Sequence, residues 1–376
     1  MKPSTPLVVR LSLGHWRLFG AVGIGVLLVT TIMAAGAIYF DSLQDLGLKR
    51  ELTLQADGSL DLSINVGSAP VSRNRHNAAL GNVLLGIDRN VGWFTGESHW
   101  GVRTSAFRFP PSPEQIQTGL DRGEDPVGSS AVFSVFQDID ERIEIVTGRM
   151  PVPATRPEPG APPVVEVMVS RSDAIKFGLE VGGSYNVTPV WISEAPDPVP
   201  VVAGIYERID SSDPFWRVRD DVLGFGPRAR SAPAVLVTTG ESYLDVLGPL
   251  FPNMDSSYGF IAPTNIDALN SRNREQAVAD MLLLVREGRG SFNNFRLTTE
   301  LDRVIGEFDV RAFFSRAPMT IVGILVLLLV LYYAVTLASL LVDAQRDEFS
   351  LLRTRGAGSL QISSVYGVEA AMIAIV

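Results

Sequence analysis

The side chains that most often carry out chemistry are few and scattered in this sequence. The three histidines, His15, His76 and His99, stand in no H-E-x-x-H motif, and no G-x-S-x-G motif marks a serine nucleophile. The chain has no cysteine, which removes thiolate chemistry and cysteine-based zinc sites. None of its three lysines stands in a Gly-Lys-Ser/Thr sequence, so a P-loop for nucleotide phosphates is missing. Nothing in these residue types and spacings calls for an active site, and any ATP hydrolysis is expected on another chain.

Residues 346–357 are the strongest candidate for binding a partner. Their apolar residues stand where a loop beside a membrane span should be polar, which favours contact with another protein. Glu348 and Arg353 add charges to the rim of that contact, and Gly356 is placed to end a short helix. The alternative is an interfacial helix that lies on lipid. The candidate coupling residues are Arg346, Glu348, Phe349, Leu351, Leu352, Arg353, Gly356 and Ala357.

The second candidate is a stalk helix over residues 299–316. The sequence TELD at 299–302 fits a capping box, and apolar residues follow it at 4-3-4 spacing. The predicted packing seam consists of Leu301, Ile305, Phe308 and Ala312. We expect it to pack against Leu43, Leu46 and Leu48, so that one stiff helix passes a displacement along its length. The alternative is an ordinary amphipathic helix that packs on the preceding domain.

Two uncharged apolar runs flank the central region. Residues 18–40 would span about 34 Å as a helix, against about 30 Å for a hydrocarbon core, and residues 317–342 are longer still. Both are predicted to be transmembrane helices. The first has an alternative as a cleaved signal peptide, since Ala35-Gly36-Ala37 resembles a cleavage site. Residues 362–376 are predicted to begin a third, truncated span, so the chain is interpreted as the N-terminal part of a longer membrane protein.

Basic residues set the expected orientation. Lys2, Arg10 and Arg17 precede the first run, and Arg346 and Arg353 follow the second. Because basic residues favour the cytoplasmic side, residues 1–17 and the coupling loop 343–361 are predicted to be cytoplasmic. The domain 41–298 and the stalk 299–316 are then expected outside. This organisation predicts a multi-pass protein of the cell membrane.

Composition limits the function classes further. The 376 residues carry a net charge of −9, which argues against nucleic acid as a partner. Hydrophobic periodicity predicts strands at 131–136, 144–146, 164–169, 185–190, 199–206 and 232–237. It predicts helices at 77–89, 170–179, 240–247 and 265–286. The expected fold class is therefore a membrane protein whose transmembrane α-helices flank an inserted α+β domain of two subdomains.

Residues 346–357, RDEFSLLRTRGA, resemble the cytoplasmic loop of FtsX-like, MacB-type ABC transporter permeases, whose pattern is approximately R-x-x-E-[FI]-x-x-L-R-x-x-G-A. The segments EIVTGRMP at 144–151 and VVEVMVSRSDAIKFGLEVGGSY at 164–185 resemble the periplasmic core domain of that family. The resemblance implies a permease subunit of the bacterial inner membrane, whose 346–357 segment docks on a separate ATPase that binds ATP and Mg. It also implies mechanotransmission to the outer domain, for export, lipoprotein or lipid extraction, or activation of another protein.

The same resemblance defines the expected partners. They are a cytoplasmic ABC ATPase, membrane lipid, a second permease copy or half, and an extracytoplasmic client protein. Two alternatives remain open from the residues alone. One is a two-span membrane receptor with an outer sensing domain, and the other is a membrane-anchored outer enzyme.

Overall fold

The computed structural model describes residues 16–55, 58–111, 116–117, 121, 129–158, 160–191, 197–219, 233–292 and 294–354. The chain divides into two compact units. One comprises Leu48–Ile305, and the other combines Met1–Gly47 with Gly306–Val376. Most of the regular structure of the first unit is one large sheet with helices, and the second contains most of two long helices.

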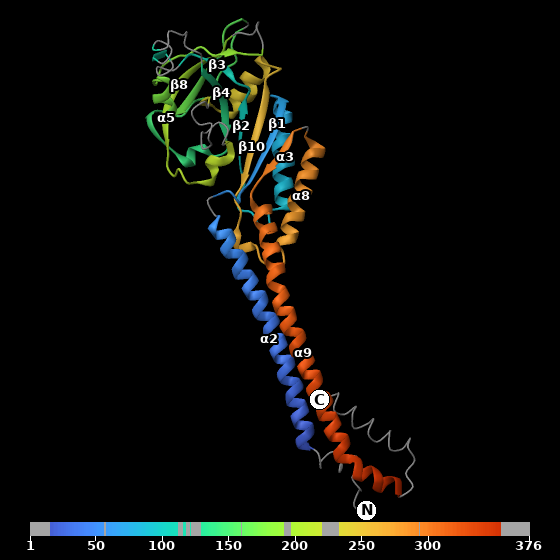
Figure 1. The fold of residues 1–376 in the computed structure, drawn as a ribbon. Coiled ribbons are helices and arrows are strands. Elements are labelled where there is room, and N and C mark those ends of the chain that lie inside the picture. Colours follow the sequence, from blue (N-terminus) through green and yellow to red (C-terminus); the bar gives the residue numbers. More distant parts are fainter. Residues whose placement is uncertain are drawn as a thin grey trace, which may run out of the picture. The chain divides into compact units, whose positions relative to one another are not determined.

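The two long helices are α2 (Trp16–Leu54) and α9 (Leu301–Thr354). With 39 and 54 residues, they are about 58 Å and about 81 Å long. Within the unit of Met1–Gly47 and Gly306–Val376 they lie side by side (Figure 1). A Cβ atom added to Gly47 would lie 3.3 Å from Cε2 of Phe308, so glycine permits a close approach there.

The membrane part of the expected fold class is wrong. Within the described residues, no helix combines the length and the apolar character that crossing a membrane requires. The prediction rested on the apolar runs 18–40 and 317–342 alone, whereas each run lies inside a longer helix that continues into charged turns. The expected transmembrane helices and the multi-pass localisation in a cell membrane are corrected by this finding. The predicted start of a third span, residues 362–376, lies outside the described residues.

The unit Leu48–Ile305 is built on a mixed sheet of eleven strands. These are β1 (Leu62–Pro70), β2 (His99–Thr104), β3 (Phe107–Phe109), β4 (Ser129–Phe136), β5 (Ile143–Gly148), β6 (Val164–Ser170), β7 (Thr188–Pro189), β8 (Val199–Arg208), β9 (Ala234–Val237), β10 (Asp255–Ala262) and β11 (Phe295–Thr298). The main path runs β11-β1-β10-β2-β4-β9-β6-β8-β5; off this path, β3 pairs with β4, and β7 pairs with β3.

One half of the sheet has the order β11-β1-β10-β2 and is entirely antiparallel. Helix α3 (Arg73–Asn90) connects β1 to β2, and α8 (Arg274–Ser291) lies between β10 and β11. Two interleaved β-α-β units in this order are the split arrangement of ferredoxin-like folds. In β1, Leu62, Ile64 and Val66 are buried and alternate with less buried polar residues, as expected for a strand with one face on a core. Both helices lie along this half (Figure 1).

The other half is inserted in the chain between β2 and β10. It contains parallel pairs, β4 with β9 and β6 with β8, and β5 forms its outer edge. Short helices complete it: η1 (Ile139–Arg142), α5 (Arg171–Phe177), η2 (Pro214–Arg219), η4 (Ser242–Leu247) and α7 (Gly248–Leu250). Phe215 and Trp216 of η2 are fully buried in a core cluster that includes Tyr206 of β8.

The expected division into two subdomains is corrected as well. Strand β2 of the ferredoxin-like half pairs with β4 of the inserted half, with Gly101 opposite Phe136 and Arg103 opposite Ser134. Backbone hydrogen bonding therefore continues from one half into the other. The fold is mixed α/β on one continuous sheet, because the pairing of β2 with β4 joins segments that sequence patterning treats separately.

Candidate functional site at the roots of the two long helices

Both long helices join the sheet through neighbouring strands. Helix α2 precedes β1, and α9 follows β11 after only two residues, Thr299 and Glu300. Strands β1 and β11 are antiparallel partners, with Ser63 opposite Thr298 and Asn65 opposite Arg296. Residues 48–55 with 58–61 are named the α2 root below, and residues 299–305 the α9 root. Of these residues, Leu48, Leu301 and Ile305 were predicted from the sequence as packing residues, whereas the polar contacts between the two roots are a tertiary feature.

The α9 root is tied to the α2 root by its first residues. The Thr299 hydroxyl donates to the carbonyl oxygen of Leu60 at 2.9 Å and accepts from the Leu301 N–H at 3.1 Å. The Glu300 N–H donates to the carbonyl oxygen of Ser59 at 2.9 Å. Thr299 thus satisfies a free N–H at the start of α9, which stabilises helix starts by about 1 kcal/mol.

Apolar side chains fix the same two segments in the core of their unit. In the α9 root, Leu301, Val304 and Ile305 are buried, and in the α2 root Leu48 and Leu52 are completely buried. Complete burial of a leucine or isoleucine side chain stabilises a fold by about 1.5–3 kcal/mol. The helix ends are therefore anchored by packing as well as by hydrogen bonds.

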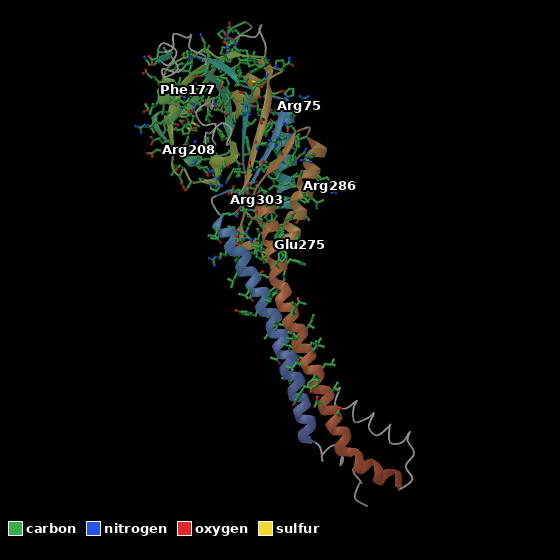
Figure 2. All side chains as sticks on the ribbon, viewed as in Figure 1. Arg75, Phe177, Arg208, Glu275, Arg286 and Arg303 are labelled. Carbon is green, nitrogen blue, oxygen red and sulfur yellow. The ribbon has the colours of Figure 1, made fainter. Side chains whose placement is uncertain are left out.

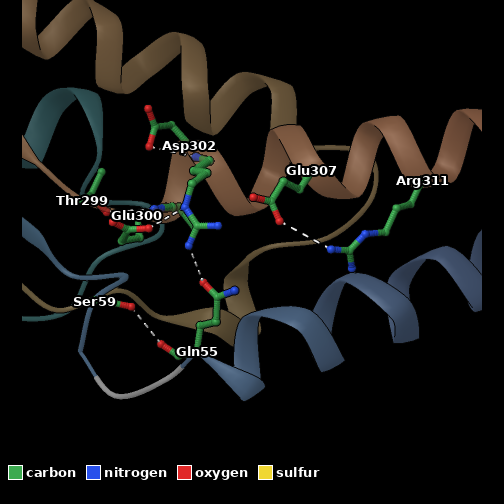
Figure 3. Close-up of polar contacts among 9 residues, drawn as sticks. Gln55, Ser59, Thr299, Glu300, Asp302, Glu307 and Arg311 are labelled. Carbon is green, nitrogen blue, oxygen red and sulfur yellow. Dashed lines mark hydrogen bonds and ion pairs between the residues drawn. The ribbon is translucent and has the colours of Figure 1, made fainter.

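Exposed polar contacts add little to this anchoring. Arg303 Nε lies 2.6 Å from Glu300 Oε2, and Arg303 Nη2 donates to Gln55 Oε1 at 3.4 Å (Figure 3). Further along α9, Arg311 pairs with Glu307 at 3.4 Å. The side chains of both ion pairs are about half exposed, and such pairs contribute at most about 1 kcal/mol.

The α2 root is fastened to the inserted half by one mostly buried ion pair. Asp61 Oδ2 lies 2.7 Å from Arg217 Nη1, and the two side chains are 10% and 24% exposed. The other carboxylate oxygen of Asp61 accepts from the Thr264 N–H at 2.9 Å. Gly58 has φ +91°, and a Cβ atom added there would lie 1.2 Å from Arg217 Nη1. The guanidinium group therefore lies directly against the backbone of the α2 root.

Thr264 completes the junction. Its hydroxyl donates to the Leu60 carbonyl oxygen at 2.6 Å, the same oxygen that accepts from Thr299. Lys49 of α2 pairs with Asp267 at 3.0 Å, in the segment that follows β10. Three segments distant in the sequence therefore converge on residues 58–61.

The four residues of the predicted stalk seam are all buried: Leu301, Ile305, Phe308 and Ala312. Of the three residues expected to receive them, only Leu48 is buried, while Leu43 and Leu46 are 44% and 65% exposed. Leu43 and Leu46 thus point away from the packed side of α2. The close approach of Phe308 is made possible by Gly47 instead.

The predicted coupling residues lie at or beyond the end of α9. The helix continues without interruption to Thr354, so the sequence positions of Arg346, Glu348, Phe349, Leu351, Leu352 and Arg353 are all helical. Gly356 and Ala357 lie outside the described residues.

Titratable groups with shifted pKa values lie away from the roots. In the inserted half, burial raises the pKa of Asp173, whose carboxylate accepts from the Val235 N–H at 3.4 Å. Burial also raises the pKa of Tyr206 and lowers that of the neighbouring Arg208, which is labelled in Figure 2. The Arg208 guanidinium lies over the ring of Trp216, 4.7 Å from its centroid. These groups support the packing of α5 and η2.

The side chains of the described residues form no recognisable metal-binding site. No group of three or more His, Asp or Glu residues among them is arranged to hold a metal ion. Burial lowers the pKa of both described histidines, His76 and His99. His76 Nδ1 lies 3.3 Å from the Tyr258 hydroxyl, so its polar contact is with a neighbouring side chain.

Several residues of the junction were not candidates from the sequence. Asp61, Arg217 and Thr264 lie far apart along the chain, and no local motif connects them. The only local signal was Gly58, which follows an aspartate and indicates a turn. No family model matches the chain, and no curated protein matches it either.

Proposed function

We propose that this chain is the permease-type subunit of an ABC transporter complex of the FtsX/MacB kind, which passes mechanical work to its own α/β unit. Such a subunit is non-catalytic, and a partner ATPase binds ATP and Mg. The supporting observation is the direct passage of α9 into β11 through Thr299 and Glu300. A long flexible linker at this point would dissipate a displacement, and a two-residue link does not.

The partner ATPase is proposed to bind the segment 346–357. Its sequence offers apolar residues for a protein contact and the opposite charges of Glu348 and Arg353 for the rim. Binding at the end of a continuous helix would place the applied force on the axis of α9. Because each helical residue has its N–H bonded to a carbonyl four residues earlier, the helix is stiff along that axis.

At the sheet, the β1–β11 ladder joins the two roots. A displacement of α9 relative to α2 therefore acts on the backbone hydrogen bonds between residues 63–66 and 295–298. The Asp61–Arg217 ion pair extends the connection to η2 and the inserted half. The whole sheet, and any client that binds it, would then respond to the ATPase.

The proposal is tested by coexpression of the full chain with an ABC ATPase from its own organism. Glu348→Arg and Arg353→Glu should each reduce co-purification of the ATPase, because each reverses a charge at the proposed contact. Glu307→Arg, an exposed charge reversal elsewhere on α9, should leave co-purification unchanged. Equal recovery of the ATPase with all three variants would contradict the assignment of the docking segment.

Transmission is tested separately by hydrogen exchange on the purified complex. Addition of ATP should change the exchange rate of amides at 63–66 and 295–298. Insertion of two glycines between Thr299 and Glu300 should abolish this change while the ATPase still co-purifies. A matched insertion in the exposed turn at Gly182–Gly183 should leave the change intact. An ATP response that survives the insertion at 299–300 would overturn the role of the short link.

A further inference from the structure

Helices α3 and α8 pack side by side in an antiparallel arrangement. Trp93 Nε1, just past the end of α3, donates to Asp280 Oδ2 at 3.0 Å, and Asn90 Nδ2 donates to Glu287 Oε2 at 3.0 Å. Arg89 forms an ion pair with the same glutamate. Residue numbers thus rise along α3 as they fall along α8, as an antiparallel pair requires.

Gly86 lets α3 approach α8, Gly288 makes room for Phe295 of β11, and a groove of about 430 Å³ remains beside them. A Cβ atom at Gly288 would lie 2.5 Å from the ring of Phe295, and one at Gly86 would lie 3.2 Å from Leu284. Without those Cβ atoms, the Leu284 and Phe295 side chains form an apolar lining. The groove has room for apolar side chains of another helix.

The rim of the groove leaves apolar surface exposed. Leu85, which lines the groove on the α3 side, is 69% exposed. Leu283 is 40% exposed and stands one turn before Glu287, on the same side of α8. Apolar side chains gathered around a groove are typical of a protein interaction site.

The charges on the rim favour one particular occupant. Arg89 and Glu287 are adjacent, opposite in sign, and 69% and 44% exposed. A surface of this kind is complementary to itself after a two-fold rotation, because each arginine can then face the glutamate of the other copy. Helix α3 also carries the apolar residue that fits the groove, since Leu85 stands one turn before Arg89.

We propose that the α3–α8 face is a self-association surface, in which α3 of a second copy places its Leu85 in the groove. The contact is reciprocal, so each copy provides one leucine and receives one. Each Arg89 contributes charge to the Glu287 of the other copy. This inference does not depend on the proposed ATPase coupling, because it concerns copies of this chain alone.

The test uses the full chain in two differently tagged forms. Arg89→Glu leaves two acidic groups on the rim, and Glu287→Arg leaves two basic ones. Each variant should co-purify with itself about tenfold less than the native chain does, owing to like-charge repulsion. A mixture of the two variants should recover association, because acidic and basic rims then face each other.

The apolar contact is tested by Leu85→Glu, which should reduce self-association, with Ile175→Glu as the matched control. Ile175 is 74% exposed on α5, remote from the groove in sequence and in fold. Thermal unfolding checks that all variants remain folded. Equal co-purification in every combination would overturn the proposal, whether the copies associate through another surface or do not associate at all. Capture of a different protein at the groove, with no second copy, would overturn it too.

Discussion

The α9 root and the α2 root meet the same pair of strands in different ways. Helix α9 follows β11 after two residues, and its connection is made by the backbone itself. Helix α2 is separated from β1 by residues 55–61, and side chains fix that link in place: Asp61 with Arg217, and Thr264 with Leu60. The α9 root therefore follows its strand almost directly, whereas the longer link between α2 and β1 is held in place by tertiary contacts.

This difference assigns separate roles to the two helices. Under the proposed coupling, a force on α9 would reach β11 through two backbone residues, whereas a force on α2 would pass through contacts that single substitutions can remove. The inserted half depends on the α2 root because Arg217 belongs to η2, whose Phe215 and Trp216 are buried in that half. The contrast predicts that substitutions at the α2 root have larger effects than those at the α9 root.

The largest effect is expected for Asp61→Ala. The substitution removes the carboxylate that pairs with the mostly buried Arg217 guanidinium. Removing one partner of a buried ion pair typically destabilises a fold by about 3 kcal/mol. The free energy of unfolding, measured by urea denaturation, should fall by that amount. The charge-exchanged double variant Asp61→Arg with Arg217→Asp should recover part of the loss. A loss of unfolding free energy below about 0.5 kcal/mol would show that the Asp61–Arg217 ion pair contributes no more than an exposed pair.

Next in size is a comparison of two glycines. Gly58→Ala should destabilise the fold by about 2 kcal/mol, because its φ of +91° is strained for alanine and the new Cβ atom displaces Arg217. Gly306→Ala, in α9, should instead stabilise by up to about 1 kcal/mol, since no neighbour lies within 4 Å and alanine favours helix. Equal effects in thermal unfolding would remove the distinction between the two glycines.

Thr299→Ala should have a smaller effect, about 1 kcal/mol, because it removes the cap of α9 and one of the two donors to the Leu60 carbonyl. The matched control is Thr53→Ala, whose exposed hydroxyl bonds only within its own helix, to the Lys49 carbonyl oxygen. We expect the control to change the unfolding midpoint in urea by much less. If the two midpoints shifted equally, Thr299 would have no special part in the junction.

The smallest expected effect is on the pH dependence of stability in the ferredoxin-like half, which carries both roots. Burial and the nearby Arg73 lower the pKa of His76 below its usual 6.5, so the folded state binds its proton less readily than the unfolded chain does. Stability should therefore fall as the pH decreases below about 6.5. His76→Gln should reduce this dependence, although His99, shifted in the same direction, will retain part of it. An unchanged pH profile in denaturation would contradict the assignment to His76.

Local patterning located much of the secondary structure in the inserted half. The predicted strands at 164–169 and 199–206 correspond to β6 and β8, because runs rich in β-branched residues have few alternatives to a buried strand. The predicted helix 77–89 lies within α3, whose apolar residues recur at helical spacing. The predicted helix 265–286 was placed too early, since α8 begins at Arg274 after a turn rich in asparagine.

The same patterning missed the strands that define the junction. Strands β1, β10 and β11 were not predicted, although they carry both roots. Strand β11 has only four residues, and β10 contains serines and a glycine, so neither has the apolar alternation that identifies a strand alone. Each is stabilised by its neighbours in the sheet, which are distant in sequence. The membrane prediction was wrong as well, since no helix of the described residues has the length and apolar character that crossing a membrane requires.

The sequence by itself determined the long helices, the buried faces of the α9 root and the lack of a P-loop, since these depend on residue types and on spacing along one segment. Tertiary structure decided which strands are neighbours, and it alone brought Asp61, Arg217 and Thr264 to one point. The physical reason is range: helical periodicity acts over a few residues, whereas strand pairing and a buried ion pair join residues that only the folded chain brings within bonding distance.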